Sequence, residues 1–159
     1  MRYSVILILS IISLCSCVKN SDNCNSKHPP IIGFQFTISN FFGEDLLNPE
    51  IQGTYNTNNI KLYYLINGEK EEVFSSNNKY PRNYKIDPYD GRYYITIFPN
   101  STESEEYPIT YVEWSDQDTD TIECAFDRGE DKVTIIRKIW FNDKLVWNFD
   151  GDPIFEIVK

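Results

Sequence analysis

The sequence feature that most constrains the fold is a series of short runs in which apolar and polar residues alternate. The clearest case is residues 60–74, where two such runs flank Asn67-Gly68. This pair readily adopts the positive φ angles of a two-residue turn, so the segment predicts a β-hairpin. Pairing across that turn places Tyr64 opposite Glu71.

A second hairpin is predicted over residues 133–149, with its turn at Asn142-Asp143. A two-residue loop at this point places Lys138 opposite Trp147 and puts Trp140 and Trp147 on one face. The stem of Lys138 is then expected to lie across the ring of Trp147.

Further strands are predicted where alternating or aromatic-rich runs recur, at residues 34–38, 92–98, 109–114, 119–126 and 154–158. Prolines, glycines and polar clusters predict loops at residues 41–52, 75–91 and 99–108. About nine strands, with turn signals every ten or so residues and no sustained helical periodicity, predict an all-β sandwich or barrel. Aromatic residues make up 15% of the chain, and this enrichment favours strands.

The first 16 residues have the composition of a secretory leader. Arg2 is followed by an apolar run over residues 5–9, which is too short to span a bilayer. The leader ends in Leu14-Cys15-Ser16-Cys17, which resembles the lipobox where bacterial lipoproteins are cleaved and lipidated on the cysteine. We therefore expect lipidation of Cys17, with an ordinary secreted protein cut nearby as the alternative.

Cleavage before Cys17 divides the chain into a signal peptide (1–16), a lipidated cysteine with a flexible tether (17–30) and one β-sandwich domain (31–159). The tether is polar and ends in two prolines, a composition that cannot form a core. It contains His28, the only histidine, and Cys24. Cys24 either pairs with Cys124 in the oxidising envelope or leaves Cys124 as a buried free thiol, which is the simpler interpretation.

The charge of the chain excludes one class of partner. The net charge is −9, and removal of Arg2 with the leader makes it −10. Binding to nucleic acid requires clustered lysine and arginine side chains, so no nucleic-acid partner is expected. The same charge disfavours electrostatic binding to an anionic membrane, so the lipid would supply the anchoring.

The loop at residues 79–85 concentrates basic and aromatic residues in this acidic chain. Tyr80 and Tyr84 are suited to stacking on sugar rings, and Arg82 and Asn83 are suited to donating hydrogen bonds. Long loops in compact domains often carry function, so these four residues are the candidate ligand-binding site. The alternative is that the tyrosines cap one end of the sandwich.

Asp116, Asp118 and Asp120 alternate as calcium ligands do, but Thr121 stands where an EF-hand loop requires glycine. If the segment is a strand, Asp118 and Asp120 share a face and are expected to point to solvent. No metal or cofactor is therefore predicted.

Three tryptophans, Trp114, Trp140 and Trp147, are suited to an exposed carbohydrate platform, although at least one is expected in the core. Asn100-Ser101-Thr102 fits an N-linked glycosylation acceptor, a chemistry that most bacteria do not use.

No catalytic constellation is apparent. A serine triad needs a histidine on the domain, and His28 lies outside it. No activating base is identifiable for Cys124, and clusters of zinc ligands are absent from the sequence. A glycosidase needs only two carboxylates, and the 24 acidic residues of the chain could supply them. Glycoside hydrolysis is therefore the one enzymatic alternative.

Several motifs recur in an order that resembles a family of small envelope lipoproteins of Bacteroidota-type bacteria. They are Phe34-x-Phe36, Gly43-x-Asp45-Leu46-Leu47-Asn48-Pro49, Ile60-Lys61-Leu62-Tyr63-Tyr64 before Asn67-Gly68, Tyr111-x-x-Trp114, Asp118-Thr119-Asp120-Thr121-Ile122 and Trp140-x-Asn142-x-x-Leu145-x-Trp147.

The resemblance covers residues 32–158 and implies an immunoglobulin-like β-sandwich of about seven to nine strands. It implies no activity and no catalytic residues. Within it, Asp120-Thr121-Ile122 is similar to the O-glycosylation signal of this bacterial group. The resemblance and the lipobox together predict a lipid-anchored protein of the cell envelope, at the outer membrane. Whether the domain faces the periplasm or the cell surface is left undetermined.

The sequence therefore predicts a non-enzymatic, membrane-anchored interaction module that meets a protein or a glycan partner. The alternative is a carbohydrate-binding accessory protein or a carbohydrate-active enzyme. An aromatic cleft would favour the alternative, whereas a flat face or an unpaired edge strand would favour a protein partner.

Overall fold

The computed structural model describes residues 33–128, 134–152 and 154–159, and these residues form ten β-strands and no helix. The strands are β1 (Phe34–Ser39), β2 (Lys61–Ile66), β3 (Glu69–Glu72), β4 (Tyr84–Tyr89), β5 (Arg92–Ile97), β6 (Ile109–Ser115), β7 (Asp118–Arg128), β8 (Thr134–Phe141), β9 (Lys144–Asn148) and β10 (Ile154–Val158). None of the described residues belongs to a helix that could cross a membrane.

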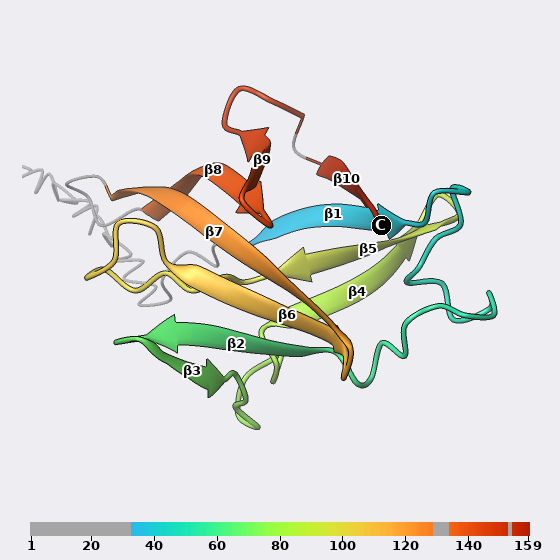
Figure 1. Cartoon of the computed structure of the whole chain (residues 1–159), viewed down its shortest axis with the longest axis horizontal. Coiled ribbons are helices and arrows are strands. Elements are labelled where there is room, and N and C mark those ends of the chain that lie inside the picture. The colour runs from blue at the N-terminus through green and yellow to red at the C-terminus, as the bar shows by residue number, and fades with distance from the viewer. Residues whose placement is uncertain (1–32, 129–133, 153) are drawn as a thin grey trace, which may run out of the picture.

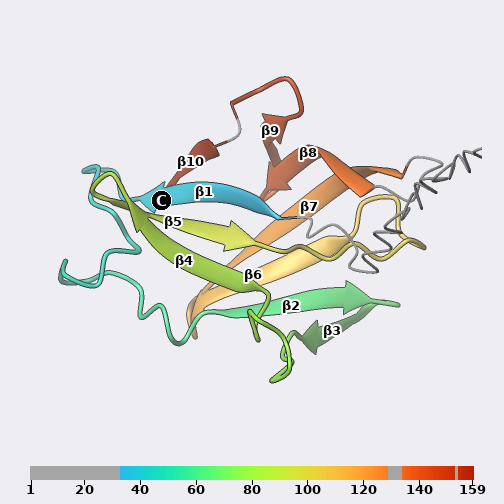
Figure 2. The same ribbon diagram turned by 180° about the vertical axis from the view of Figure 1, so that it is seen from behind.

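The ten strands form two sheets, which Figures 1 and 2 show from opposite sides. One sheet has four strands in the order β10-β1-β5-β4, and the other has six in the order β3-β2-β6-β7-β8-β9. Neighbouring strands are antiparallel except for β1 and β10, which are parallel. The prediction of an all-β, mainly antiparallel fold is confirmed.

Both sheets contribute alternate apolar residues to one core. Phe36 of β1 lies at its centre, fully buried, with its ring stacked on Phe155 of β10 at 5.3 Å. From the other sheet, Trp114 of β6 and Phe141 of β8 meet the same ring edge-on. Each such aromatic pair contributes about 0.5–1.5 kcal/mol beyond the burial of its area, so Phe36 holds the two sheets together.

The first predicted hairpin is confirmed in position and register. Tyr64 pairs with Glu71 across β2 and β3. The turn residues Asn67 and Gly68 have φ angles of 51° and 84°. Positive φ at both central positions defines the turn that matches the twist of paired strands, which explains the choice of Asn-Gly here.

The second hairpin has the predicted turn but a different register. Asn142 and Asp143 both have positive φ, yet a bulge between Ile139 and Trp140 places Trp147 opposite Ile139. The prediction that Lys138 faces Trp147 is therefore wrong, because the extra residue of a bulge shifts all later pairs. Trp147 packs against the core, and Lys138 lies 6.0 Å above the ring of Trp140 instead.

Residues 75–91 were expected to be irregular throughout, and this prediction is wrong for β4. Its register with β5 runs from Tyr84 opposite Ile97 to Tyr89 opposite Arg92, closing at the Asp90-Gly91 turn. The strand could not be recognised in the sequence because it contains Pro88, and proline is rare within strands. Proline is tolerated here because β4 is an edge strand and does not need to donate on its open side.

Candidate functional site

A cleft of about 600 Å³ lies between residues 53–59, which lead into β2, and the β6–β7 turn. Figure 1 shows these two segments meeting at one end of the molecule. The cleft is lined by Gly53, Thr54, Tyr55, Asn56, Asn58, Asn59, Lys61, Arg82, Trp114, Ser115 and Asp116.

Two aromatic rings contribute to the cleft. The ring of Tyr55 stacks on that of Trp114 with centroids 5.3 Å apart and planes at 25°. Trp114 is 1% exposed and belongs to the core, as expected for at least one tryptophan. Tyr55 covers it and is itself half-buried. The aromatic surface offered to a ligand is therefore mainly that of Tyr55.

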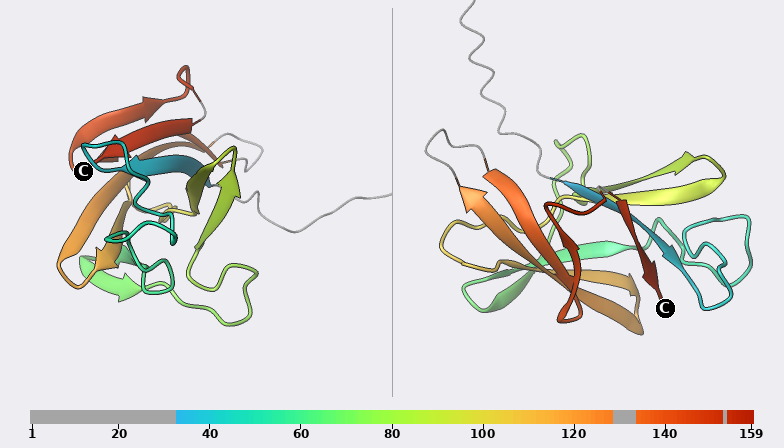
Figure 3. Two further views of the ribbon diagram at one scale, coloured as in Figure 1. Left: turned by 90° about the vertical axis from the view of Figure 1, so that its right-hand side faces the viewer. Right: turned by 90° about the horizontal axis from the view of Figure 1, so that it is seen from above.

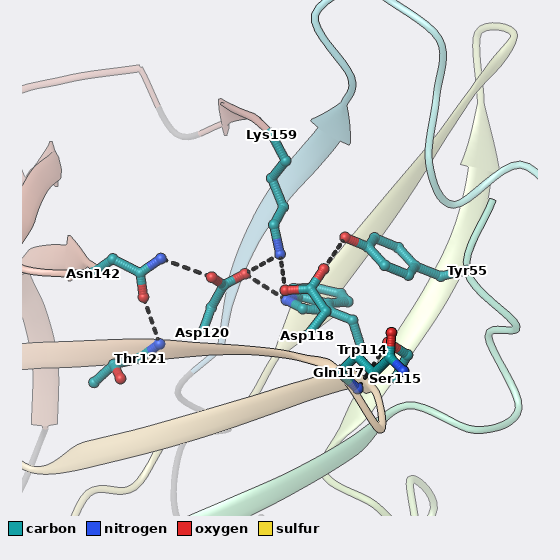
Figure 4. A network of polar contacts seen from close by, with 9 residues as sticks. All are labelled: Tyr55, Trp114, Ser115, Gln117, Asp118, Asp120, Thr121, Asn142 and Lys159. Atoms are coloured by element: carbon teal, nitrogen blue, oxygen red, sulfur yellow. Dashed lines mark hydrogen bonds and ion pairs between the residues drawn. The ribbon is translucent and has the colours of Figure 1, made fainter. Parts of the chain in front are cut away.

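A polar network of residues that do not line the cleft fixes both rings (Figure 4). The Tyr55 hydroxyl donates to Asp118 Oδ2 at 2.5 Å, and Trp114 Nε1 donates to Asp120 Oδ2 at 2.6 Å. Lys159 Nζ lies 2.5 Å from Asp118 Oδ1 and 2.7 Å from Asp120 Oδ2. The side chain of Asn142 completes the network by donating to Asp120 Oδ1.

The network corrects the expectation that Asp118 and Asp120 point to solvent. They do share a face of β7, but Asp120 is only 4% exposed. The carboxylates face inward because Lys159, which follows β10, supplies the opposite charge that a buried carboxylate needs. This contact could not be predicted, since Lys159 is 39 residues from Asp120 in the chain.

Burial raises the pKa of the Tyr55 hydroxyl well above its ordinary value, and its hydrogen bond to Asp118 acts in the same direction. Tyr55 therefore stays protonated at neutral pH and donates to Asp118. This role is structural, because the hydroxyl is already engaged by Asp118, which does not line the cleft.

The four residues of the predicted binding loop separate in the structure. Arg82 lines the cleft, with Nη1 3.5 Å from Glu72 Oε1. Tyr84 belongs to β4, and its hydroxyl donates to the Thr57 carbonyl at 2.8 Å, which holds the cleft-forming segment in place.

The other two residues lie away from the lining. Tyr80 stacks on Phe98 at 5.4 Å, and the Asn83 side chain donates to the Tyr64 hydroxyl at 2.9 Å. Asn83 also has a φ of 54°, a conformation that asparagine tolerates better than most residues.

The sequence interpretation missed the asparagines of the cleft. Asn56, Asn58 and Asn59 are exposed there, and the side-chain amides of Asn58 and Asn59 make no hydrogen bond to another described residue. Each free amide offers two donors and an acceptor oxygen to a ligand. The signal that could have identified them is the run Asn56-Thr57-Asn58-Asn59 directly before an expected strand.

Lys61 adds a cation to the cleft, paired at 2.9 Å with Glu113 on the neighbouring strand. This hydrogen bond raises the pKa of Lys61 and lowers the pKa of Glu113. Both groups are therefore charged at neutral pH, and Lys61 remains a donor for a polar ligand.

The other candidate groups occupy structural positions. Cys124 is a buried free cysteine whose thiol pKa is raised by burial, while Cys17, Cys24 and His28 lie outside the described residues. Asn100 is 1% exposed and donates to the Leu65 carbonyl.

Thr121 lies within β7, opposite Tyr111. The described residues contain no group of three or more histidine, cysteine or acidic side chains placed to hold a metal ion. The ammonium of Lys159 stands between Asp118 and Asp120, the two carboxylates that had been considered for calcium.

Comparisons with protein-family models, with curated proteins and with solved structures gave no match to this chain.

Proposed function

We propose that this protein is a non-enzymatic, membrane-anchored binding module of the bacterial cell envelope, and that its cleft binds a carbohydrate. The observation that carries the proposal is the cleft lining, in which free amides and two cations surround one half-exposed aromatic ring. Sugar hydroxyls both donate and accept hydrogen bonds, which suits the amides of Asn58 and Asn59. The ring of Tyr55 offers an apolar surface to a sugar face.

The number of carboxylates that line the cleft favours binding of a sugar over its hydrolysis. Glycosidases use two carboxyl groups about 5–10 Å apart on either side of the bond that breaks. Asp116 is the one carboxylate among the described residues that line the cleft. Asp118 and Asp120 do not line the cleft and are paired with Lys159. The enzymatic alternative would need a second carboxylate in the cleft.

The proposal includes lipidation of Cys17 and a tether over residues 18–30 that holds the domain at the outer membrane. The lipobox-like sequence supports it, since a lipid attached to the first mature residue converts a soluble domain into an anchored one. We further propose an immunoglobulin-like sandwich, which the two sheets around a buried tryptophan support.

A glycan array tests the binding site directly. The full chain in detergent is compared with a double variant, Asn58→Ala with Asn59→Ala, and with Arg82→Gln. Asn78→Ala is the matched control, because Asn78 is also an exposed asparagine but does not line the cleft.

The proposal predicts a glycan signal that both cleft variants lose and the control retains. A signal that all four proteins share would place binding elsewhere. If no glycan binds the wild-type chain, the carbohydrate proposal is wrong.

A further inference from the structure

The strands β9 and β10 follow one another in the chain but do not pair. β9 is the last strand of the six-stranded sheet, and β10 is the last strand of the four-stranded sheet. They run side by side in opposite directions, as the left view of Figure 3 shows. Each has a strand neighbour on one side only, β8 for β9 and β1 for β10, within the described part of the chain.

Two hollows separate the strands. One, of about 360 Å³, lies between the end of β9 and the start of β10, and the other, of about 480 Å³, lies between the start of β9 and the end of β10. Together they follow both strands along their length, and we call them the edge groove. They share no residue with the lining of the carbohydrate cleft.

Apolar side chains form the floor and rim of the edge groove. Val146, Trp147 and Phe155 pack against the core, while Ile154 and Val158 are 42% and 53% exposed. Residues of alternating exposure along β10 are typical of a strand that has a neighbour on one side and a core below.

We propose that the edge groove binds an extended segment of a partner polypeptide, which inserts as an additional β-strand between β9 and β10. An edge strand presents a row of unpaired backbone N–H and C=O groups. Here two such edges face a single groove. An extended peptide can pair with both rows at once, whereas a glycan or a lipid chain cannot.

The charges at the ends of the edge groove indicate which charged residues the partner segment carries at its own ends. Lys144 lines one end, and Asp152 lines the other. Neither forms an ion pair with another described residue, whereas Glu156 and Lys159, which also line the Lys144 end, are paired with Arg92 and with Asp118 and Asp120. A fitting segment therefore has apolar residues at alternate positions over about five residues, an acidic residue at the Lys144 end and a basic residue at the other.

Synthetic peptides test this proposal on the full chain in detergent. The probes are Glu-Thr-Val-Thr-Val-Thr-Val-Thr-Lys, its reversed sequence, and versions with isoleucine or phenylalanine in place of valine. A peptide of the same composition with its valines grouped together is the control. Binding is measured by fluorescence anisotropy up to about 1 mM peptide, a weak-affinity limit, and located by hydrogen exchange.

We expect at least one alternating peptide to bind, with one direction preferred, and the grouped peptide not to bind. Amide exchange in β9 and β10 should slow by about tenfold or more, because bound edges become protected. A double variant, Ile154→Lys with Val158→Lys, should abolish binding. Both residues are exposed, so the fold should tolerate the change. Phe42→Lys is the control, since Phe42 is 91% exposed and lies outside the edge groove.

Three results would overturn the proposal. The first is that none of the alternating peptides binds. The second is equal binding of the grouped peptide or of the Ile154→Lys, Val158→Lys variant, which would indicate unspecific adhesion. The third is protection of β9 and β10 that rises with protein concentration alone, which would identify a second copy of this chain as the occupant. Because the cleft and the edge groove have separate linings, glycan binding can fail without affecting this test, and the converse also holds.

Discussion

The substitution Lys159→Met tests whether the polar network behind the cleft depends on charge. The side chains alone are 21% exposed for Lys159, 32% for Asp118 and 5% for Asp120. Methionine keeps an apolar stem beside the rings of Tyr55 and Trp114 but removes the ammonium group.

The structure sets the expected magnitude. Removing one partner of a fully buried ion pair costs about 3–5 kcal/mol, whereas an exposed pair contributes about 0–1 kcal/mol. The buried carboxylate of Asp120 keeps its hydrogen bonds from Trp114 and Asn142, and water reaches part of Lys159 and Asp118. We therefore expect the free energy of unfolding to fall by an intermediate amount, about 2–3 kcal/mol.

Urea unfolding at pH 7 measures this loss. For a domain of this size the slope is about 1.5–2 kcal/mol/M, so the midpoint should fall by about 1–2 M. Arg137→Met is the matched control, because the Arg137–Asp127 pair is 40% and 48% exposed and should contribute less than about 1 kcal/mol.

A triple variant separates charge from packing. Adding Asp118→Asn and Asp120→Asn to Lys159→Met removes the uncompensated negative charges, and at least half of the lost stability should return. The network does not depend on charge if Lys159→Met destabilises the domain no more than Arg137→Met does, or if the triple variant is less stable than Lys159→Met.

Further predictions concern pH, the cleft, a turn and the anchor. The pKa of Tyr55 is raised in the folded state. The contribution of Tyr55 to the free energy of unfolding is therefore fully present below pH 10 and is lost as the pH rises above 10. Between pH 9 and pH 11, the free energy of unfolding should therefore decline less steeply for Tyr55→Phe than for the wild-type chain. The two slopes should differ by at most about 1.4 kcal/mol per pH unit. Tyr84→Phe removes the hydrogen bond to the Thr57 carbonyl, so amide exchange in residues 53–59 should accelerate while that of β2 does not. Gly68→Ala, at a φ of 84°, should cost about 1 kcal/mol in unfolding free energy, and no change would contradict the turn geometry. Cys17→Ala should move the protein from the membrane to the soluble fraction of the envelope, whereas retention in the membrane would refute lipidation at this residue.

The local features of the fold could be predicted from the sequence, because they depend on neighbouring residues. Asn67-Gly68 specified both the turn and the register of β2 and β3. The bulge beside Trp140 could not be predicted, since both its strands have apolar residues that fit either register. The strand β4 was missed because Pro88 is a breaker in most strands and is tolerated only at an edge, a position that depends on the whole sheet.

The cleft itself could not be predicted from the sequence, for a similar reason. Of the four residues of the predicted binding loop, Arg82 lines it, and the asparagines come from a segment more than 20 residues earlier. The buried state of Asp120 depends on Trp114 of β6 and on Lys159, which follows β10. Alternating acidic residues in an isolated strand resemble a solvated face, and only tertiary contacts distinguish the two cases.

The measurement that most directly tests the carbohydrate cleft is hydrogen exchange of the full chain with and without the glycan that gives the strongest array signal. We predict that exchange slows in residues 53–59 and in the β6–β7 turn, and that the exchange rates of β9 and β10 do not change. Protection at residues 75–81 or in the edge groove, with none at residues 53–59, would contradict the assignment of the cleft as the carbohydrate site.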